Sequence, residues 1–288
     1  MEKICDLHVH STYSDGTCTP VELIRLAKER HLHAVALCDH NTVAGLPDFL
    51  EAACGSGVWA VPGIEFSTDY DNRELHILAL FVKPEYYSAV TEKVAEMVRR
   101  KEQSNIDLVA GLGGAGIRLD YDKIKAGTLG GSVNRAVIAA EMVRKGYCES
   151  VKAAFSDYLS ASKGYYIPPQ RLGSVEVIRF IKSIGAVAVL AHPFLTYNEE
   201  QLRAFLELAV PAGLDGMEVQ YSAYDEQTTA RSAVITEDFG ILQSGGSDYH
   251  GMNKPHISIG VGQGNLCIPF SLAEMLRKRA AKRSILNK

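Results

Sequence analysis

The chain has 288 residues, of which 47% are hydrophobic and 22% are charged, and its formal net charge is −4. This composition is ordinary for a globular protein and gives no general electrostatic attraction to nucleic acid, so a long polynucleotide would need a local basic patch. No apolar run approaches the ~20 residues that span a bilayer. The length allows one large α/β domain or two small ones, without membrane association.

Six cysteines are scattered along the chain without a CxxC pair, a pattern typical of the reducing cytoplasm. The first strand-like run begins within a few residues of Met1 and leaves no room for a signal peptide. We therefore expect a cytoplasmic protein.

Strand-like apolar runs alternate with helical patterns at both ends of the chain, which predicts a mostly parallel sheet closed by helices. Thr19 and Pro20, followed by Glu22, form a capping-box signal for a helix that ends near Arg30. Thr42 is expected to cap the next helix, which ends near Gly55. Strands are predicted near residues 3–9, 33–39, 58–65, 74–82, 186–191, 214–219 and 240–245.

The middle of the chain, from roughly residue 86 to 172, breaks this alternation. Its helical periodicity predicts an inserted helical subdomain, expected to act as a cap over the site. The predicted organisation is a first barrel part at 1–98, an inserted helical cap at 99–172 and a second barrel part at 173–288.

Six of the nine histidines and three acids lie at the ends of apolar runs. Strand ends of an α/β barrel converge on one face, so these residues can meet there although they are far apart in sequence. Imidazole and carboxylate are the groups that hold Zn, Mn and Fe. The predicted metal ligands are His8, His10, Asp15, His40, Glu65, His76, His192, Asp248 and His250. We interpret His31, His33 and His256 as ordinary residues.

The segments that contain these residues resemble the PHP (polymerase and histidinol phosphatase) family of metal-dependent phosphoesterases. The resemblance covers Asp6 to about Gly260, and within the family the chain is most similar to the stand-alone branch that removes phosphate from nucleotides. Asn41 and Val137 stand where the family often has Asp and His. The matching segments are Asp6-Leu7-His8-Val9-His10-Ser11, Ser14-Asp15-Gly16, Asp39-His40-Asn41, Pro62-Gly63-Ile64-Glu65, Leu190-Ala191-His192-Pro193 and Gly246-Ser247-Asp248-Tyr249-His250-Gly251.

The resemblance implies a distorted (β/α)7 barrel of the PHP type with an inserted helical subdomain, and two or three divalent metal ions, Mn, Fe or Zn. It implies that one ion is held by His8, His10, Glu65 and Asp248, a second by Glu65, His76 and His192, and a third by Asp15, His40 and His250. A carboxylate that bridges two ions organises such a centre, and Glu65 is predicted to be that bridge. Glu65, Asp15, His40 and His192 are the predicted catalytic residues.

Three residues beside the predicted ligands are weaker candidates for a role in the site. Asp39 is expected either to accept the ring N–H of a ligand histidine or to cap a turn. Asp6 is expected to face the barrel interior, and Tyr249 either reaches a leaving group or packs. No residue outside the ligand set stands out as the general acid.

Substrate contacts are predicted in the inserted segment. Asn134 and Arg135 begin a helix that resembles the family segment reaching toward substrate phosphate, and a guanidinium is a planar fork of donors suited to phosphate. Lys163 could supply a second cation, and Tyr165 or Tyr166 could stack on a base.

The predicted function is hydrolysis of phosphate monoesters of nucleotides by metal-activated water. The substrate is a 5′-mononucleotide or a nucleoside 3′,5′-bisphosphate, with 5′ ends of short RNA as a further substrate. The alternatives are a histidinol-phosphate phosphatase with the same centre, an amidohydrolase-type metal hydrolase, and a non-catalytic metal-binding module. An amidohydrolase usually has a carbamylated lysine, and no lysine ends a predicted strand in this set. The sequence sets neither the metal, the exact substrate nor the oligomeric state.

Overall fold

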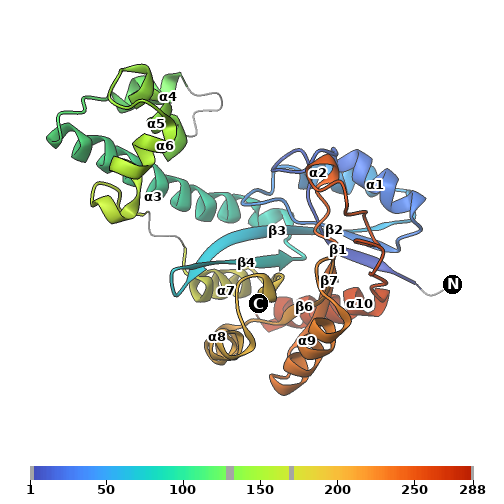
Figure 1. Cartoon of the computed structure of the whole chain (residues 1–288). Helices are drawn as coiled ribbons and strands as arrows, with labels where there is room; N and C mark the ends of the chain where they lie inside the picture. Colours follow the sequence, from blue (N-terminus) through green and yellow to red (C-terminus); the bar gives the residue numbers. More distant parts are fainter. Residues whose placement is uncertain (1–2, 128–132, 169–171, 287–288) are drawn as a thin grey trace. The chain divides into compact units, whose positions relative to one another are not determined.

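The computed structural model describes residues 3–127, 133–168 and 172–286 (Figure 1). The chain divides into two compact units. The first, here the barrel unit, comprises Met1–Glu92 and Leu172–Lys288, and the second, the helical unit, comprises Lys93–Arg171. All nine predicted metal ligands belong to the barrel unit.

The barrel unit is built on a seven-stranded, mixed sheet in which the strands follow their order in the chain. Beyond the last strand, the backbone N–H of Asp248 donates to the His8 carbonyl at 2.8 Å, and that of His10 donates to the Tyr249 carbonyl at 2.9 Å. These bonds bring the two edges of the sheet together into a nearly closed barrel. The strands are β1 (Cys5–Val9), β2 (Ala34–Leu37), β3 (Trp59–Tyr70), β4 (Arg73–Leu80), β5 (Val187–Leu190), β6 (Gly216–Tyr221) and β7 (Leu242–Gly246). Each overlaps its predicted range, and β3 continues to Tyr70, beyond its predicted end at residue 65.

One strand reverses the otherwise parallel order. β4 is antiparallel to both β3 and β5, whereas the other neighbours pair in parallel. β3 and β4 form a hairpin through Asp71 and Asn72, whose φ angles of 55° and 58° are those of a two-residue turn that Asp and Asn tolerate. Glu65 therefore lies within a long strand, and His76 lies near the start of a strand rather than at its end. The expectation that every ligand follows a strand is wrong for these two.

The helices of the barrel unit surround this sheet (Figure 1). Thr19 caps the first helix with the predicted capping box. Thr42 does not cap the second helix, because its hydroxyl accepts the backbone N–H of Ala44 and the helix begins after Gly45. The helices are α1 (Pro20–Glu29), α2 (Leu46–Ala53), α7 (Ser174–Ser183), α8 (Glu199–Ala212), α9 (Glu226–Asp238) and α10 (Phe270–Leu286).

The main core lies inside the sheet and is closed by the last helix. Leu272 and Leu276 of α10 are buried in the same cluster as Leu7 of β1, Leu78 of β4 and Val189 of β5. Burying each such side chain stabilises the fold by about 1.5–3 kcal/mol. The barrel is thus a packed support for the residues at its edge.

The helical unit has a core of its own. Leu108 and Leu112 pack with Ile138, Met142 and Leu159. Helix α3 (Tyr87–Gly114) enters this unit and is followed by α4 (Tyr121–Ala126), α5 (Arg135–Arg144), α6 (Val151–Ala154), a π-helical turn η3 (Phe155–Leu159) and η4 (Ala161–Lys163). Within the described residues, no helix combines the length and apolar character needed to cross a membrane.

Candidate metal centre

Two irregularities of strand pairing turn polar side chains toward one point. Between Asp6 and Val9, β1 carries one residue more than β2, so Leu7 joins the apolar core while His8 approaches Glu65. A similar shift in β6 follows Glu218. Such bulges re-aim side chains and are common beside active sites.

Glu65 is the centre of the cluster. One of its carboxylate oxygens lies 3.2 Å from His8 Nε2, 3.3 Å from His10 Nε2 and 3.1 Å from His40 Nδ1. The other lies 2.8 Å from His76 Nδ1 and 3.1 Å from His192 Nε2. Each oxygen therefore faces a different group of ring nitrogens, as a carboxylate that bridges two cations would.

Asp248 adds a carboxylate beside the first pair of histidines. Its Oδ1 lies 3.2 Å from His10 Nε2 and 3.8 Å from His8 Nε2, and the two histidine nitrogens are 3.1 Å apart. Two neighbouring ligand atoms that each lie ~2.1 Å from one cation are ~3.0 Å apart in octahedral geometry and ~3.4 Å apart in tetrahedral geometry. These spacings fit a shared cation.

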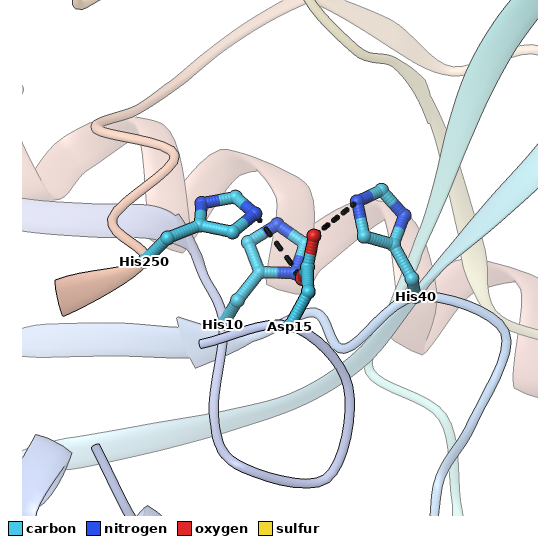
Figure 2. A group of neighbouring side chains, drawn as sticks. All are labelled: His10, Asp15, His40 and His250. Atoms are coloured by element: carbon cyan, nitrogen blue, oxygen red, sulfur yellow. Dashed lines mark ion pairs between the residues drawn. The ribbon is translucent and has the colours of Figure 1, made fainter. Parts of the chain in front are cut away.

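Asp15 collects a further group of histidines. Figure 2 shows its carboxylate between the rings of His250 and His40, with His10 alongside. The Asp15 oxygens lie 3.2 Å from His250 Nε2 and 3.8 Å from His40 Nε2. His40 presents its other nitrogen to Glu65, so it stands between the Asp15 group and the Glu65 group.

The outer nitrogens of two histidines are held in place. His8 Nδ1 lies 2.9 Å from the carboxylate of Glu218, and His250 Nδ1 lies 2.8 Å from the Asp248 carbonyl. A proton on each Nδ1 leaves the Nε2 lone pair facing the cluster, which is how metal-binding histidines are usually oriented. Glu218 is not among the residues predicted from sequence, although an acid between apolar residues of a predicted strand is a signal for such a role.

Several buried polar atoms of the cluster lie close to other polar atoms but form no hydrogen bond of suitable angle with the described residues. They are His10 Nδ1, His40 Nδ1, His76 Nδ1 and Glu65 Oε2. Because buried polar groups are normally satisfied, such a set requires an explanation, and a bound ion is one. Imidazole nitrogens and carboxylate oxygens at these spacings fit divalent Zn, Mn or Fe.

The carboxylates of the cluster are ionised, as carboxylate ligands of a metal must be. Burial would raise the pKa of the Glu65 carboxyl, but His8, His10, His192 and His76 hold it well below its usual value. Burial likewise opposes ionisation of Asp248, and His10 and His8 lower its pKa. Burial opposes protonation of His8, His10 and His76, but the neighbouring acids raise the pKa of each ring above its ordinary value, that of His76 to about 9. His40 differs, because burial lowers its pKa to about 4 and favours the neutral imidazole that binds metals.

The cluster has a buried floor and an open rim. His8, His10 and Glu65 are fully buried, whereas the Asp15 side chain is 54% exposed and that of His40 is 25% exposed. A ligand can therefore reach the rim from solvent while the floor stays rigid.

Backbone strain marks two of the ligand segments. His192 has a φ of 28° and Asp248 a φ of 56°, in a region that non-glycine residues rarely adopt. The backbone N–H of His192 donates to Glu218 at 2.7 Å, which helps to hold this conformation. Such outliers gather at functional sites because the surrounding structure must over-determine them.

The acids beside the ligands have structural roles. Asp39 accepts hydrogen bonds from the Ser11 backbone and from the Ser11 and Ser14 hydroxyls, so it organises the turn that carries Asp15 instead of a histidine ring. Asp6 is fully buried and accepts bonds from Ser247, Gly260 and His8. Tyr249 contacts Cys18 through its hydroxyl at 3.5 Å.

The predicted substrate contacts lie in the helical unit. The Asn134 side chain caps α5 by accepting the Val137 N–H at 3.0 Å. The guanidinium of Arg135 stacks 4.1 Å from the Tyr166 ring centre and donates to the Leu159 carbonyl at 3.3 Å. Lys163 is exposed.

Residues 6–170, more than half of the chain, match the model of the PHP domain. The chain belongs to the PHP family. The barrel-like sheet agrees with this family membership.

Two PHP relatives match over most of their length. The chain is 32% identical over 253 residues to a 5′-3′ exoribonuclease of Haemophilus influenzae, covering 87% of this chain and 91% of that one. It is 28% identical over 250 residues to a 3′,5′-nucleoside bisphosphate phosphatase of Chromobacterium violaceum, covering 85% and 86%.

Two solved structures are similar over 96% of both chains. One, from Bifidobacterium adolescentis, is provisionally assigned as a metal-dependent phosphoesterase and superposes with a TM-score of 0.66 at 29% identity. The other, from Chromobacterium violaceum, is described as an amidohydrolase with bound sulfate and no metal, with a TM-score of 0.68 at 25% identity. Because the chain belongs to the PHP family and its relatives over most of its length are hydrolytic enzymes, it is a phosphoesterase.

Proposed function

We propose that this PHP phosphoesterase hydrolyses phosphate monoesters of nucleotides, with 5′-mononucleotides and nucleoside 3′,5′-bisphosphates as substrates and 5′ ends of short RNA as a further one. The observation that carries the proposal is the Glu65 carboxylate, whose two oxygens face separate groups of histidine nitrogens. The names of the two curated relatives, an exoribonuclease and a bisphosphate phosphatase, support the nucleotide class.

The cluster would hold two or three divalent ions, Mn, Fe or Zn. Glu65 would bridge them, the pair His8 and His10 would bind on one side with Asp248, and His76 and His192 on the other. Asp15, His40 and His250 would complete the site toward solvent. When bound, such ions neutralise the phosphate dianion and lower the pKa of a bound water toward ~7.

The chain itself contributes orientation and access. Glu218 fixes the ring of His8 from behind, so the buried floor needs little rearrangement when the substrate enters. The exposed side chain of Asp15 and the part-exposed ring of His40 form the rim that the phosphate ester must pass.

The test is a substrate comparison with metal-loaded protein. Phosphate and nucleotide products are quantified for a 5′-mononucleotide, a nucleoside 3′,5′-bisphosphate, a short 5′-phosphorylated RNA and histidinol phosphate. We expect release of phosphate from the first two and of mononucleotides from the RNA. If only histidinol phosphate is hydrolysed, the substrate is histidinol phosphate and not a nucleotide. Turnover of none of the four would refute the proposal.

We also propose that the helical unit contacts the remote part of the nucleotide through Arg135, with Asn134 beside it in sequence and Lys163 as a second cation. Arg135→Ala is expected to raise KM for the nucleotide about tenfold, the loss of one hydrogen bond to a charged group, while hydrolysis of p-nitrophenyl phosphate persists.

Arg144→Ala is the matched control, because Arg144 lies on the same helix and pairs with Glu141 at 2.6 Å on the surface. Equal effects of Arg135→Ala on both substrates would remove Arg135 from the substrate site.

A further inference from the structure

Lys254 is a cation beside the metal centre that no sequence motif singled out. Its ammonium lies 2.6 Å from Asp248 Oδ2, the oxygen that faces away from His8 and His10. Tyr221 donates its hydroxyl to the same oxygen at 2.8 Å. Only Oδ1 of Asp248 therefore faces the histidines. The Asp248 carboxylate lies between the Lys254 ammonium and the histidines of the cluster.

The ammonium has donors to spare. Of its three N–H groups, one is directed at Asp248, and the described residues provide no other acceptor for the Lys254 side chain. The side chain is 35% exposed, so its remaining donors are open to a ligand from solvent. A half-buried cation with unused donors at the edge of a phosphoesterase site is suited to a phosphate oxygen.

The loop that carries Lys254 is fastened to the segment that carries Asp15. The Asn253 side chain donates to the Asp15 carbonyl at 2.7 Å, and the Met252 N–H donates to the Thr17 hydroxyl at 2.8 Å. The Lys254 N–H donates to the Gly251 carbonyl at 3.1 Å. These bonds hold the base of the lysine near both Asp15 and Asp248, which reduces the entropy that the side chain loses on binding a ligand.

We propose that Lys254 is a substrate-contacting residue whose ammonium donates a hydrogen bond to an oxygen of the reacting phosphate group. This inference rests on the proposed phosphoesterase function and deepens it. In the free protein the Lys254 ammonium pairs with Asp248 alone. In the complex it would also donate to the phosphate dianion. No proton transfer from Lys254 is required.

The competing explanation is that Lys254 only holds Asp248. Tyr221 provides the means to separate the two roles, because it bonds to the same carboxylate oxygen without carrying a charge. If holding Asp248 were the whole role, removing either donor would have the same consequence. If Lys254 contacts phosphate, loss of the lysine should weaken phosphate binding more than loss of the Tyr221 hydroxyl does.

The experiment measures binding of inorganic phosphate to metal-loaded protein by calorimetry, independently of turnover. For Lys254→Met we expect Kd for phosphate to rise about 10- to 100-fold, with metal content and melting temperature close to wild type. Lys254→Arg should retain part of the affinity, and Tyr221→Phe should bind phosphate nearly as wild type does. Lys278→Met, a change on the exposed side of α10, is the control for loss of one positive charge.

Unchanged phosphate affinity of Lys254→Met overturns the inference, as does a wild-type protein that binds no phosphate. Equal loss in Lys254→Met and Tyr221→Phe, together with lost metal, also overturns it in favour of a positioning role. If wild-type protein binds phosphate through Lys254 but releases none from any nucleotide, the proposed function fails while the phosphate contact stands.

Discussion

Replacing Glu65 by Gln is expected to lower kcat at least about 1,000-fold while leaving the fold intact. A single well-placed donor to developing charge is already worth about 10²–10³ in kcat, and Glu65 organises several groups at once. Its two oxygens lie within 3.3 Å of nitrogens from five histidines, and an amide would turn an N–H toward one of these groups and remove the charge that balances bound cations.

The measurements are steady-state turnover of a nucleotide, metal content by mass spectrometry, and circular dichroism for the fold. Glu29→Gln is a matched control, because Glu29 pairs with Arg25 on the surface of α1. Glu65→Asp keeps the charge and should retain more metal than Glu65→Gln. A Glu65→Gln protein with wild-type turnover would refute the bridging role.

Replacing His192 by Ala is expected to reduce turnover about 100-fold or more and to deplete part of the bound metal. His192 faces one oxygen of the Glu65 carboxylate and His8 faces the other, so loss of His192 should deplete the ion at the first oxygen and spare the ion at the second. Partial loss of metal in His192→Ala would therefore show that the ions occupy distinct positions, whereas Glu65→Gln should lower the occupancy of all of them.

His256→Ala is the appropriate control, since His256 is exposed in a loop outside the cluster. If His192→Ala retains both full metal content and full turnover, His192 is not a ligand.

Most strands could be predicted from sequence because their buried parts are short apolar runs, whereas β3 continues through polar residues to Tyr70. The Thr19 capping box was equally readable, since the hydroxyl and the Glu22 carboxylate act within one turn of helix. Grouping the ligands followed from the rule that strand ends converge, although that rule is not why Glu65 and His76 meet.

What the sequence analysis missed depends on strand direction and side-chain orientation. The Asp71-Asn72 pair is a two-residue hairpin signal, from which the antiparallel direction of β4 could have been predicted. Glu218 on β6 reaches His8 on β1, two strands away, and the contact of Lys254 with Asp248 depends on how a loop folds back. Long-range contacts of this kind leave no periodic trace along the chain.

The most direct test of the account is the number of metal ions bound per chain, measured together with phosphatase activity before and after chelation. We predict two or three equivalents of divalent metal, loss of activity when a chelator removes them, and recovery when Mn, Fe or Zn is returned. Full activity in protein shown to be free of metal would contradict the central claim.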